Sequence, residues 1–108
     1  YYKTEGFYDE ELLVIVYTFT NNSNNTISFS DAIEDKLFQN GVELDLYIAA
    51  NIQGQVDIRD SFKELQPGAS FDVPRAYVLN FDTPSTINIE VKKEDGTGET
   101  LQCTFEIE

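Results

Sequence analysis

Apolar and polar side chains alternate with a period of two along most of the chain, which is the pattern of β-strands with one buried face. The run over residues 11–20, ELLVIVYTFT, is apolar on both faces and rich in β-branched and aromatic residues. Such a run favours a strand that is covered on both sides. We therefore expect residues 11–20 to form a central strand of a sheet.

A tract of small polar residues, TNNSNNT, occupies residues 20–26 directly after this run. Asn and Ser side chains bond to nearby backbone groups and tolerate left-handed conformations, so such a tract favours a turn. It is too short for an interdomain linker. We expect it to join the strand at 11–20 to a second strand that contains Ile27 and Phe29.

Two further turns are predicted from dipeptides. Asn40-Gly41 lies between alternating residues and predicts a two-residue hairpin in which Gln39 faces Val42 and Leu37 faces Leu44. Pro67-Gly68 predicts a type II turn, because proline fixes φ at its second position and glycine accepts positive φ at its third. Both turns favour antiparallel strands on either side.

The segments between these turns are less regular. Residues 30–34, SDAIE, predict a helical turn capped by Ser30 or Asp31. Residues 71–79 return to a strand pattern, but Pro74 cannot donate a ladder hydrogen bond, so we expect an edge position or a bulge there. Residues 49–61 form the longest irregular segment, and long loops often carry function.

The C-terminal part predicts a hairpin with one buried and one solvated face. Ile87, Ile89 and Val91 alternate with polar residues, as do Leu101, Cys103, Phe105 and Ile107, and residues 94–98 join the two strands. Cys103 shares its face with Leu101 and Phe105. We therefore interpret it as a buried hydrophobic residue and not as a reactive thiol.

Seven or eight short strands with hardly any helix predict an all-β fold, an antiparallel β-sandwich. The 108 residues fit one domain that spans 1–108. Hydrophobic residues make up 41% of the chain, enough for a core without disulfide or metal staples. The one cysteine excludes an internal disulfide.

The order of these strand and turn marks resembles a known family. The marks are YTFTNNS at 17–23, FQNGVEL at 38–44, LQPGAS at 65–70 and AYVL at 76–79. They are similar to a family of Gram-positive bacterial lipoprotein ectodomains known only as a domain of unknown function. The resemblance covers residues 12–91 and implies an immunoglobulin-like β-sandwich. It also implies a precursor with a signal peptide and an N-terminal lipid-carrying cysteine, and it supplies no catalytic residues.

The charge narrows the set of partners. Seven basic residues stand against twenty acidic ones, for a net charge of −13. Such a chain repels nucleic-acid phosphates and anionic lipid, so we expect no nucleic-acid partner and membrane contact only through the implied lipid anchor. The longest apolar run is far too short to span a bilayer, and the first residues, YYKTE, show no secretory signal. A cationic partner or Ca²⁺ remains compatible with the charge.

Catalytic signals are sparse. Histidine is absent, which removes the commonest general base and the Ser-His and Cys-His pairs. One cysteine cannot build a thiolate zinc site alone, and no phosphate-binding loop is present, so we expect no cofactor. Asp31, Glu34 and Asp35 are weak calcium candidates, because they do not match the calcium-loop pattern.

Two segments are candidates for binding. The first is the irregular loop, with polar or charged side chains at Asn51, Gln53, Gln55, Asp57, Arg59 and Asp60. The second is the aromatic N-terminus, with Tyr1, Tyr2, Phe7 and Tyr8, which either forms a ligand surface or packs as a first strand.

Together these features predict a non-enzymatic, extracellular module for protein or ligand binding at the bacterial envelope, lipid-anchored in its precursor. Its partner is an unknown protein or small ligand. The first alternative is a structural or spacer domain of a surface protein. A hydrolase that uses an Asp/Glu pair is the second alternative, and it needs a cleft that the sequence does not reveal.

Overall fold

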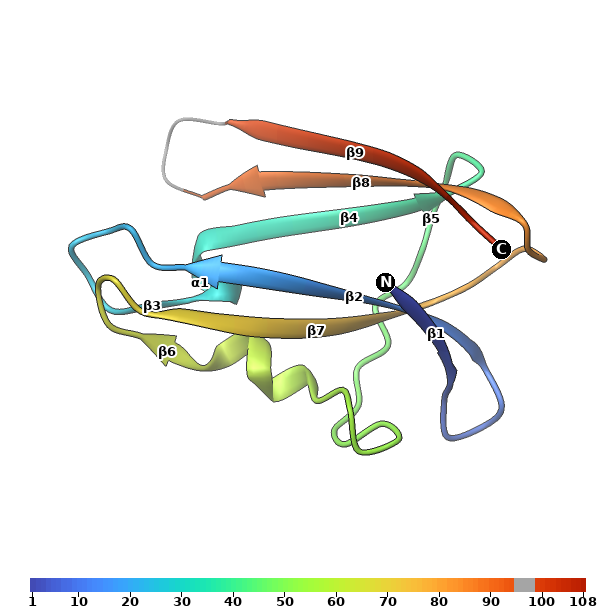
Figure 1. Ribbon diagram of the computed structural model, residues 1–108, viewed down its shortest axis with the longest axis horizontal. Helices are drawn as coiled ribbons and strands as arrows, with labels where there is room; N and C mark the ends of the chain where they lie inside the picture. The colour runs from blue at the N-terminus through green and yellow to red at the C-terminus, as the bar shows by residue number, and fades with distance from the viewer. Residues whose placement is uncertain (95–98) are drawn as a thin grey trace.

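The computed structural model describes residues 1–94 and 99–108 (Figure 1). Most of the described chain is β-strand, in antiparallel ladders. The elements, in chain order, are β1 (Tyr2–Glu5), β2 (Glu11–Thr20), β3 (Ile27–Ser28), α1 (Phe29–Ala32), β4 (Ile33–Gln39), β5 (Val42–Glu43), the 3-10 helix η1 (Ile58–Phe62), β6 (Glu64–Leu65), β7 (Ser70–Val78), β8 (Ser85–Lys93) and β9 (Thr100–Ile107). The described residues form nine strands, more than the expected seven or eight. The excess comes from the short strands β3, β5 and β6, which are only two residues long.

Two larger sheets face each other. One has the strand order β1-β2-β7 and the other the order β5-β4-β8-β9, while β3 and β6 form a small pair at one end (Figure 1). β2 lies between β1 and β7, with Leu13 opposite Tyr77 in the ladder. The central position predicted for residues 11–20 is therefore confirmed.

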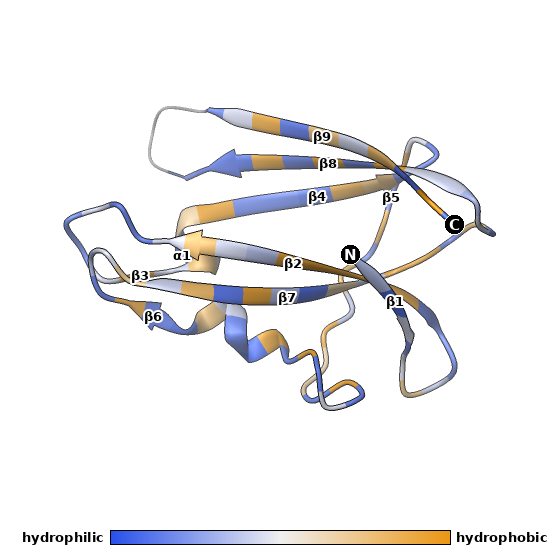
Figure 2. Ribbon diagram, in the orientation of Figure 1, coloured by the Kyte–Doolittle hydropathy of each residue, from blue (hydrophilic) through white to orange (hydrophobic). Residues whose placement is uncertain are grey.

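The main core fills the space between the two sheets. Strands from both sheets send apolar side chains inward, and Figure 2 shows hydrophobic positions recurring along β2, β4 and β8. Each fully buried Leu or Ile contributes about 1.5–3 kcal/mol through removal of its surface from water. The buried members are Leu13, Ile15, Leu37, Leu44, Tyr77, Ile87, Ile89 and Ile107.

A second, smaller core lies on the opposite face of β2. Leu12 and Val14 point away from the sandwich and pack with Ala76 of β7 against Ile52 and Val56. The last two residues belong to the irregular segment between β5 and η1, which crosses this face. The apolar character of both faces of β2 thus has a direct cause, since each face supports a separate core.

The predicted turns have the expected geometry. Asn40 and Gly41 have φ of 51° and 84°, and Gln39 lies opposite Val42. Leu44 N donates to Leu37 O at 2.8 Å, which extends this hairpin. Gly68 has φ of 87°, and Ala69 N donates to Gln66 O at 3.0 Å across the Pro67-Gly68 turn.

The TNNSNNT tract joins β2 to β3 through a turn built on Asn21, whose side chain is fully buried. Asn21 Nδ2 donates to the carbonyls of Asn25 and Leu65, both at 2.8 Å. Asn21 Oδ1 accepts from the Ser23 amide at 2.9 Å and from the Ser23 hydroxyl at 2.7 Å. The turn is therefore held internally and also anchored to β6.

Pro74 lies in β7, which is an edge strand of its sheet, as expected. The helical turn is displaced from its predicted position. It spans Phe29–Ala32 and is capped by Ser28, not by Ser30 or Asp31. The correction has a clear cause, because Asp31 occupies the third helical position and closes a capping box with Ser28.

The expected burial of Cys103 is wrong. Ile87 and Ile89 on β8 are buried as predicted, whereas Cys103 is exposed and Leu101 on the same face of β9 is 54% exposed. β9 is the edge strand of the four-stranded sheet, and the facing sheet has only three strands. The facing sheet therefore covers only Phe105 and Ile107 of β9. The predicted joining turn includes residues 95–98, which lie outside the described residues. Among the described residues, no helix has the length and apolar character that crossing a membrane requires.

Candidate functional site

The two candidate binding segments from the sequence meet at one end of the molecule. The β1–β2 connection carries Phe7 and Tyr8, and the segment after β5 carries Tyr47. Phe7 N donates to Tyr47 Oη at 3.0 Å, and the two rings lie 6.5 Å apart between centroids. Phe7, Tyr8 and Tyr47 are named the aromatic rim below.

The rim is held by its backbone while its outer rings face solvent. Tyr8 N donates to Glu10 Oε1 at 2.7 Å, yet the Tyr8 residue is 87% exposed. Gly6 permits this arrangement, because a Cβ there would lie 2.8 Å from Tyr47 Oη. Exposed aromatic rings on an ordered backbone are typical of binding surfaces, since they offer large contact area at low entropic cost.

The neighbouring irregular loop is also ordered. Asn51 and Gln53 have positive φ, and Ile52 bridges Val56 across a tight turn that leaves Gln55 exposed. Gln53 Nε2 donates to Glu5 O at 3.2 Å, which connects this turn to β1. The turn that contains Asn51, Gln53 and Gln55 is thus joined through Gln53 to the end of β1.

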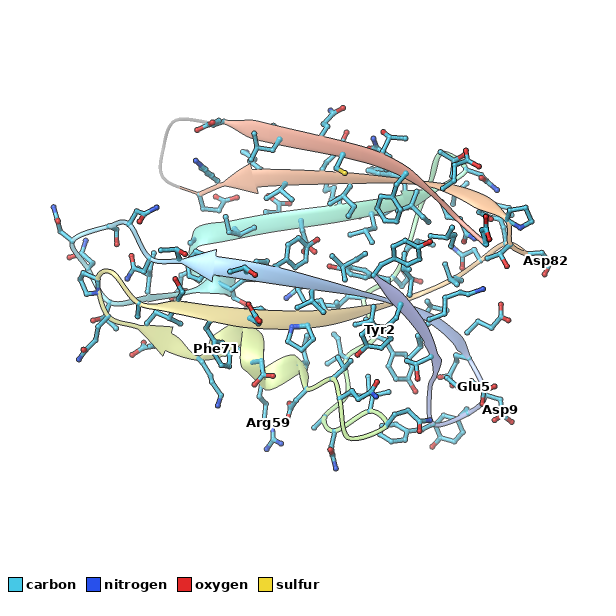
Figure 3. All side chains as sticks on the ribbon, in the orientation of Figure 1. Tyr2, Glu5, Asp9, Arg59, Phe71 and Asp82 are labelled. Atoms are coloured by element: carbon cyan, nitrogen blue, oxygen red, sulfur yellow. The ribbon has the colours of Figure 1, made fainter. Side chains whose placement is uncertain are left out.

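The remaining loop candidates belong to the start of η1. Asp57 caps this helix by accepting from Arg59 N at 2.9 Å. Arg59 Nη2 also donates to Asp57 Oδ2 at 2.6 Å, and the hydrogen bonds from Arg59 lower the pKa of Asp57. Asp60 lies in the first turn of the same helix. In Figure 3, Arg59 points outward at some distance from Glu5 and Asp9, which flank the rim.

The structure also contains an internal polar cluster that was not predicted from the sequence. Arg75 of β7 and Asp35 of β4 point into the sandwich, and their side chains are 11% and 4% exposed. Arg75 Nη2 lies 3.2 Å from Asp35 Oδ1, and Arg75 Nη1 donates to the buried Ser61 Oγ at 2.7 Å. The pair therefore links the two sheets and η1.

Two tyrosines complete this polar cluster. Tyr17 Oη donates to Asp35 Oδ2 at 2.9 Å, and Tyr77 Oη donates to the same oxygen. Burial, followed by the charge of Tyr77 and of Asp35, raises the pKa of Tyr17 well above its ordinary value. Burial and then Asp35 also raise the pKa of Tyr77. Charge neutralisation and hydrogen bonds thus satisfy every member, so the cluster is suited to joining the sheets.

The calcium candidates are not brought together as ligands. Asp31 closes the capping box of α1, and Asp35 is engaged with Arg75. Glu34, on the next position of β4, lies opposite Lys92 in the ladder. Within residues 1–94 and 99–108, no group of three His, Cys, Asp or Glu side chains is arranged to hold a metal ion. Arg75 opens into the same shallow depression as the three acids, and its positive charge opposes a cation there.

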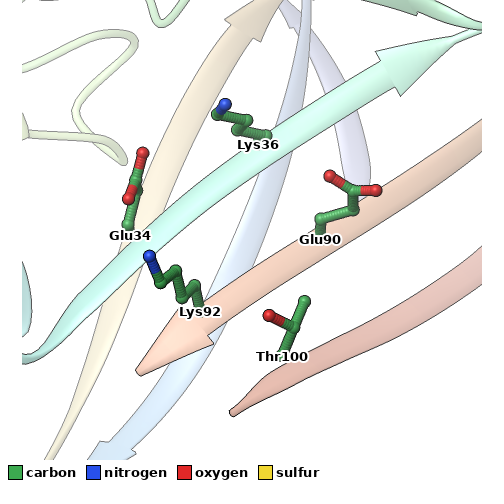
Figure 4. A pocket seen from close by; sticks show the side chains of 5 residues that line it. All are labelled: Glu34, Lys36, Glu90, Lys92 and Thr100. Atoms are coloured by element: carbon green, nitrogen blue, oxygen red, sulfur yellow. The ribbon is translucent and has the colours of Figure 1, made fainter. Parts of the chain in front are cut away.

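A second depression lies on the solvated face of the four-stranded sheet (Figure 4). Glu34 and Lys36 of β4 lie opposite Lys92 and Glu90 of β8, with Thr100 of β9 beside them. Opposite charges on facing strands stabilise a sheet by roughly 0.2–1 kcal/mol per pair. We interpret this face as a charge ladder that supports strand register.

A sequence signal for the internal cluster existed. The strand pattern Ile33-x-Asp35-x-Leu37 assigns a carboxylate to the same face as two apolar residues. The pattern Val73-x-Arg75-x-Tyr77 does the same for a guanidinium. A charged residue at an inward strand position needs a partner of opposite charge, so the two patterns together predict a buried pair.

Comparison with known protein families matches residues 1–93 to one described as "Domain of unknown function (DUF5067)". No curated protein and no solved structure is similar enough to this chain to be matched. The match spans β1 to β8, and thus the three-stranded sheet, the aromatic rim and the four-stranded sheet except β9. The chain therefore belongs to the DUF5067 family.

Proposed function

We propose that this chain is a non-enzymatic binding module at the surface of a Gram-positive cell, in which an immunoglobulin-like β-sandwich captures a protein or ligand through the aromatic rim. The observation that carries the proposal is the rim itself. Phe7 and Tyr8 expose their rings on a backbone pinned by Tyr47 and Glu10. Neighbouring exposed aromatic residues on an ordered backbone are a common feature of protein-binding surfaces.

The charge around the rim suggests the chemistry of the partner. Glu5 and Asp9 flank the β1–β2 connection (Figure 3), and the chain as a whole carries −13. A partner that presents Lys or Arg around an apolar or aromatic knob complements such a surface. Its association is expected to be accelerated by the net charge and weakened by salt.

The side chains most capable of chemistry support a binding role over an enzymatic one. Asp35 and Arg75 are neutralised by each other inside the sandwich, and Asp57 is bonded to Arg59. Lipid anchoring of the precursor remains part of the proposal. It would hold the rim near the cell surface, and it rests on the resemblance to lipoprotein ectodomains.

The test is capture from a solubilised envelope fraction of a Gram-positive bacterium. The immobilised chain is compared with the variant F7S/Y8S and with F62S, quantifying bound proteins by mass spectrometry. F62S is the matched control, because Phe62 is an exposed aromatic residue that is not part of the aromatic rim. It lies on η1, which packs against α1.

We expect a species that is retained by the original chain and by F62S and lost with F7S/Y8S, with retention falling as salt rises. The same set of proteins on all three surfaces would rule out the rim as the binding site. Circular dichroism and melting temperature must show that F7S/Y8S remains folded.

A further inference from the structure

β9 is a long edge strand whose outer side is contacted by Tyr1 at Glu106. It is eight residues long, and the strand order places it at the end of its sheet, with β8 on one side only. The edge of β7 carries Pro74 and receives backbone bonds from residues 45–47, with Val78 N donating to Asp45 O at 2.9 Å. β9 has no proline and no lysine, which are the usual guards of an open edge.

The backbone groups on this edge can be identified from the ladder. Lys93 N donates to Glu99 O at 3.0 Å, so these two residues form a hydrogen-bonded pair. Because such pairs alternate, Leu101, Cys103 and Phe105 direct their backbone groups toward β8, whereas Gln102, Thr104 and Glu106 direct theirs outward. Tyr1 Oη donates to Glu106 O at 3.4 Å from outside the ladder, which agrees with this assignment.

We propose that the outer edge of β9 pairs antiparallel with β9 of a second copy of this chain, about a two-fold axis at Cys103. The two four-stranded sheets then form one continuous sheet. In this register Gln102 exchanges backbone hydrogen bonds with Thr104 of the second copy, and Leu101 lies opposite Phe105 of the second copy. The Leu101 and Cys103 side chains, exposed in the isolated chain, gain an apolar neighbour.

The side-chain order of β9 favours a second copy as the occupant. An isologous interface needs a sequence that complements itself when reversed. Within residues 101–105, apolar residues oppose apolar ones and Gln102 opposes Thr104; towards the ends Glu106 opposes Thr100 and Glu99 opposes Ile107, so no like charges face each other. This complementarity matters because two chains of −13 each repel at long range.

Neighbouring registers are less favourable. A shift of the centre to Gln102 places Glu99 opposite Phe105 of the second copy, on the apolar face. Tyr1 contacts the Glu106 carbonyl, which a shift to Thr104 needs for the pairs next to the centre, whereas the register centred on Cys103 needs it only for the outer pair with Thr100. The register centred on Cys103 relies on Gln102 and Thr104 for its central bonds.

The first experiment uses Cys103 as a reporter of register. Centred on Cys103, the two thiols form a non-hydrogen-bonded pair with Cα atoms roughly 4.5 Å apart, within disulfide range. Diamide accepts two electrons and two protons from the pair of thiols and is reduced to its hydrazine as the S–S bond forms. We expect rapid formation of a covalent dimer on a non-reducing gel.

The register control is L101C/C103S. Its two thiols lie four residues apart along the ladder, or roughly 14 Å. It is therefore expected to cross-link at least tenfold more slowly than the original chain. Equal cross-linking rates would indicate random collision and would overturn the proposal.

The second experiment measures association without any covalent link, by sedimentation of C103S-background variants. Q102K/T104K places lysine opposite lysine twice in the dimer, whereas Q102K/T104E places lysine opposite glutamate twice. We expect the first variant to raise Kd roughly tenfold relative to C103S and the second to restore it. Both substituted side chains are exposed, so folding should be retained.

A C103S chain that stays monomeric at all concentrations would refute the interface, and so would equal Kd values for the two charge variants. The rim variant F7S/Y8S is expected to dimerise normally. Loss of β9 pairing therefore leaves the rim proposal intact, and loss of rim binding leaves this one intact.

Discussion

Replacing Arg75 by methionine removes the positive charge that lies between the two sheets while keeping a long apolar stem. The change deletes the 3.2 Å contact with Asp35 and the 2.7 Å hydrogen bond to Ser61. It also deletes the contact of the guanidinium with the Phe29 ring, whose centroid lies 5.3 Å away. Asp35 would remain as an unpaired carboxylate in the interior.

The stability that Arg75→Met loses follows from the burial of Asp35. Removing one member of a buried ion pair typically destabilises by 3–5 kcal/mol, because the other charge is left uncompensated. Asp35 would keep its bonds from Tyr17 and Tyr77, so we expect the lower end, about 3 kcal/mol. With an unfolding entropy of about 2.1 cal/mol/K per residue over the 108 residues, this lowers Tm by roughly 13 °C.

The matched control is Arg59→Met. Arg59 is bonded to Asp57 at 2.6 Å, but its side chain is 73% exposed, so the loss of stability is expected to be much smaller than for Arg75→Met. Urea unfolding at pH 7, followed by far-ultraviolet circular dichroism, measures both variants. The slope of free energy against urea must stay constant for the comparison to hold.

A partial rescue distinguishes a charge effect from lost packing. R75M/D35N removes both charges and keeps a side chain that accepts from the tyrosines, so it should recover about 1 kcal/mol relative to Arg75→Met. If Arg75→Met costs no more than Arg59→Met, or if the double variant is less stable than Arg75→Met, the buried pair does not connect the sheets as argued.

Three further predictions concern stability and the rim. Because burial and nearby charge raise the pKa of Tyr17 and of Tyr77 above the unfolded value of about 10, their contribution is complete below pH 10 and declines above it. Above pH 10, each tyrosine should lower the free energy of unfolding by about 1.4 kcal/mol per pH unit. Tyr17→Phe should therefore reduce the dependence of urea stability on pH between pH 9 and pH 11. Asn21→Ala removes two buried donors and two acceptor contacts and should cost about 2 kcal/mol in urea, while the exposed Asn22→Ala should cost almost nothing. Gly6→Ala forces a Cβ against Tyr47, so envelope capture should fall with stability lowered by about 1 kcal/mol; unchanged capture would disconnect Gly6 from the rim.

The local chemistry of the sequence was sufficient to predict much of the fold. The two apolar faces of residues 11–20 indicated the central strand, and both faces are buried in its first half. Asn40-Gly41 specified register as well as position, because a two-residue turn fixes which residues face each other. These features depend on neighbours in the chain.

The features that the sequence reading missed depend on distant contacts. Alternation assigns Cys103 to the inner face, but whether that face is covered depends on how far the opposing sheet extends. Asp35 and Arg75 lie forty residues apart, and only the packing of β4 on β7 pairs them. The meeting of the loop at residues 51–55 with the β1–β2 connection likewise requires the fold.

The small outer core has a consequence for how this surface can diversify. Ile52 and Val56 anchor their segment on β2, and Tyr47 packs beside them, so changes at these positions would disturb a structural support. Phe7 and Tyr8 project beyond that support and carry little of its packing. Selection for a new binding target is therefore expected to change Phe7 and Tyr8 freely while it preserves Tyr47, Ile52 and Val56. Deep mutational scanning of residues 5–10 and of residues 47–56 would measure this difference in tolerance to substitution.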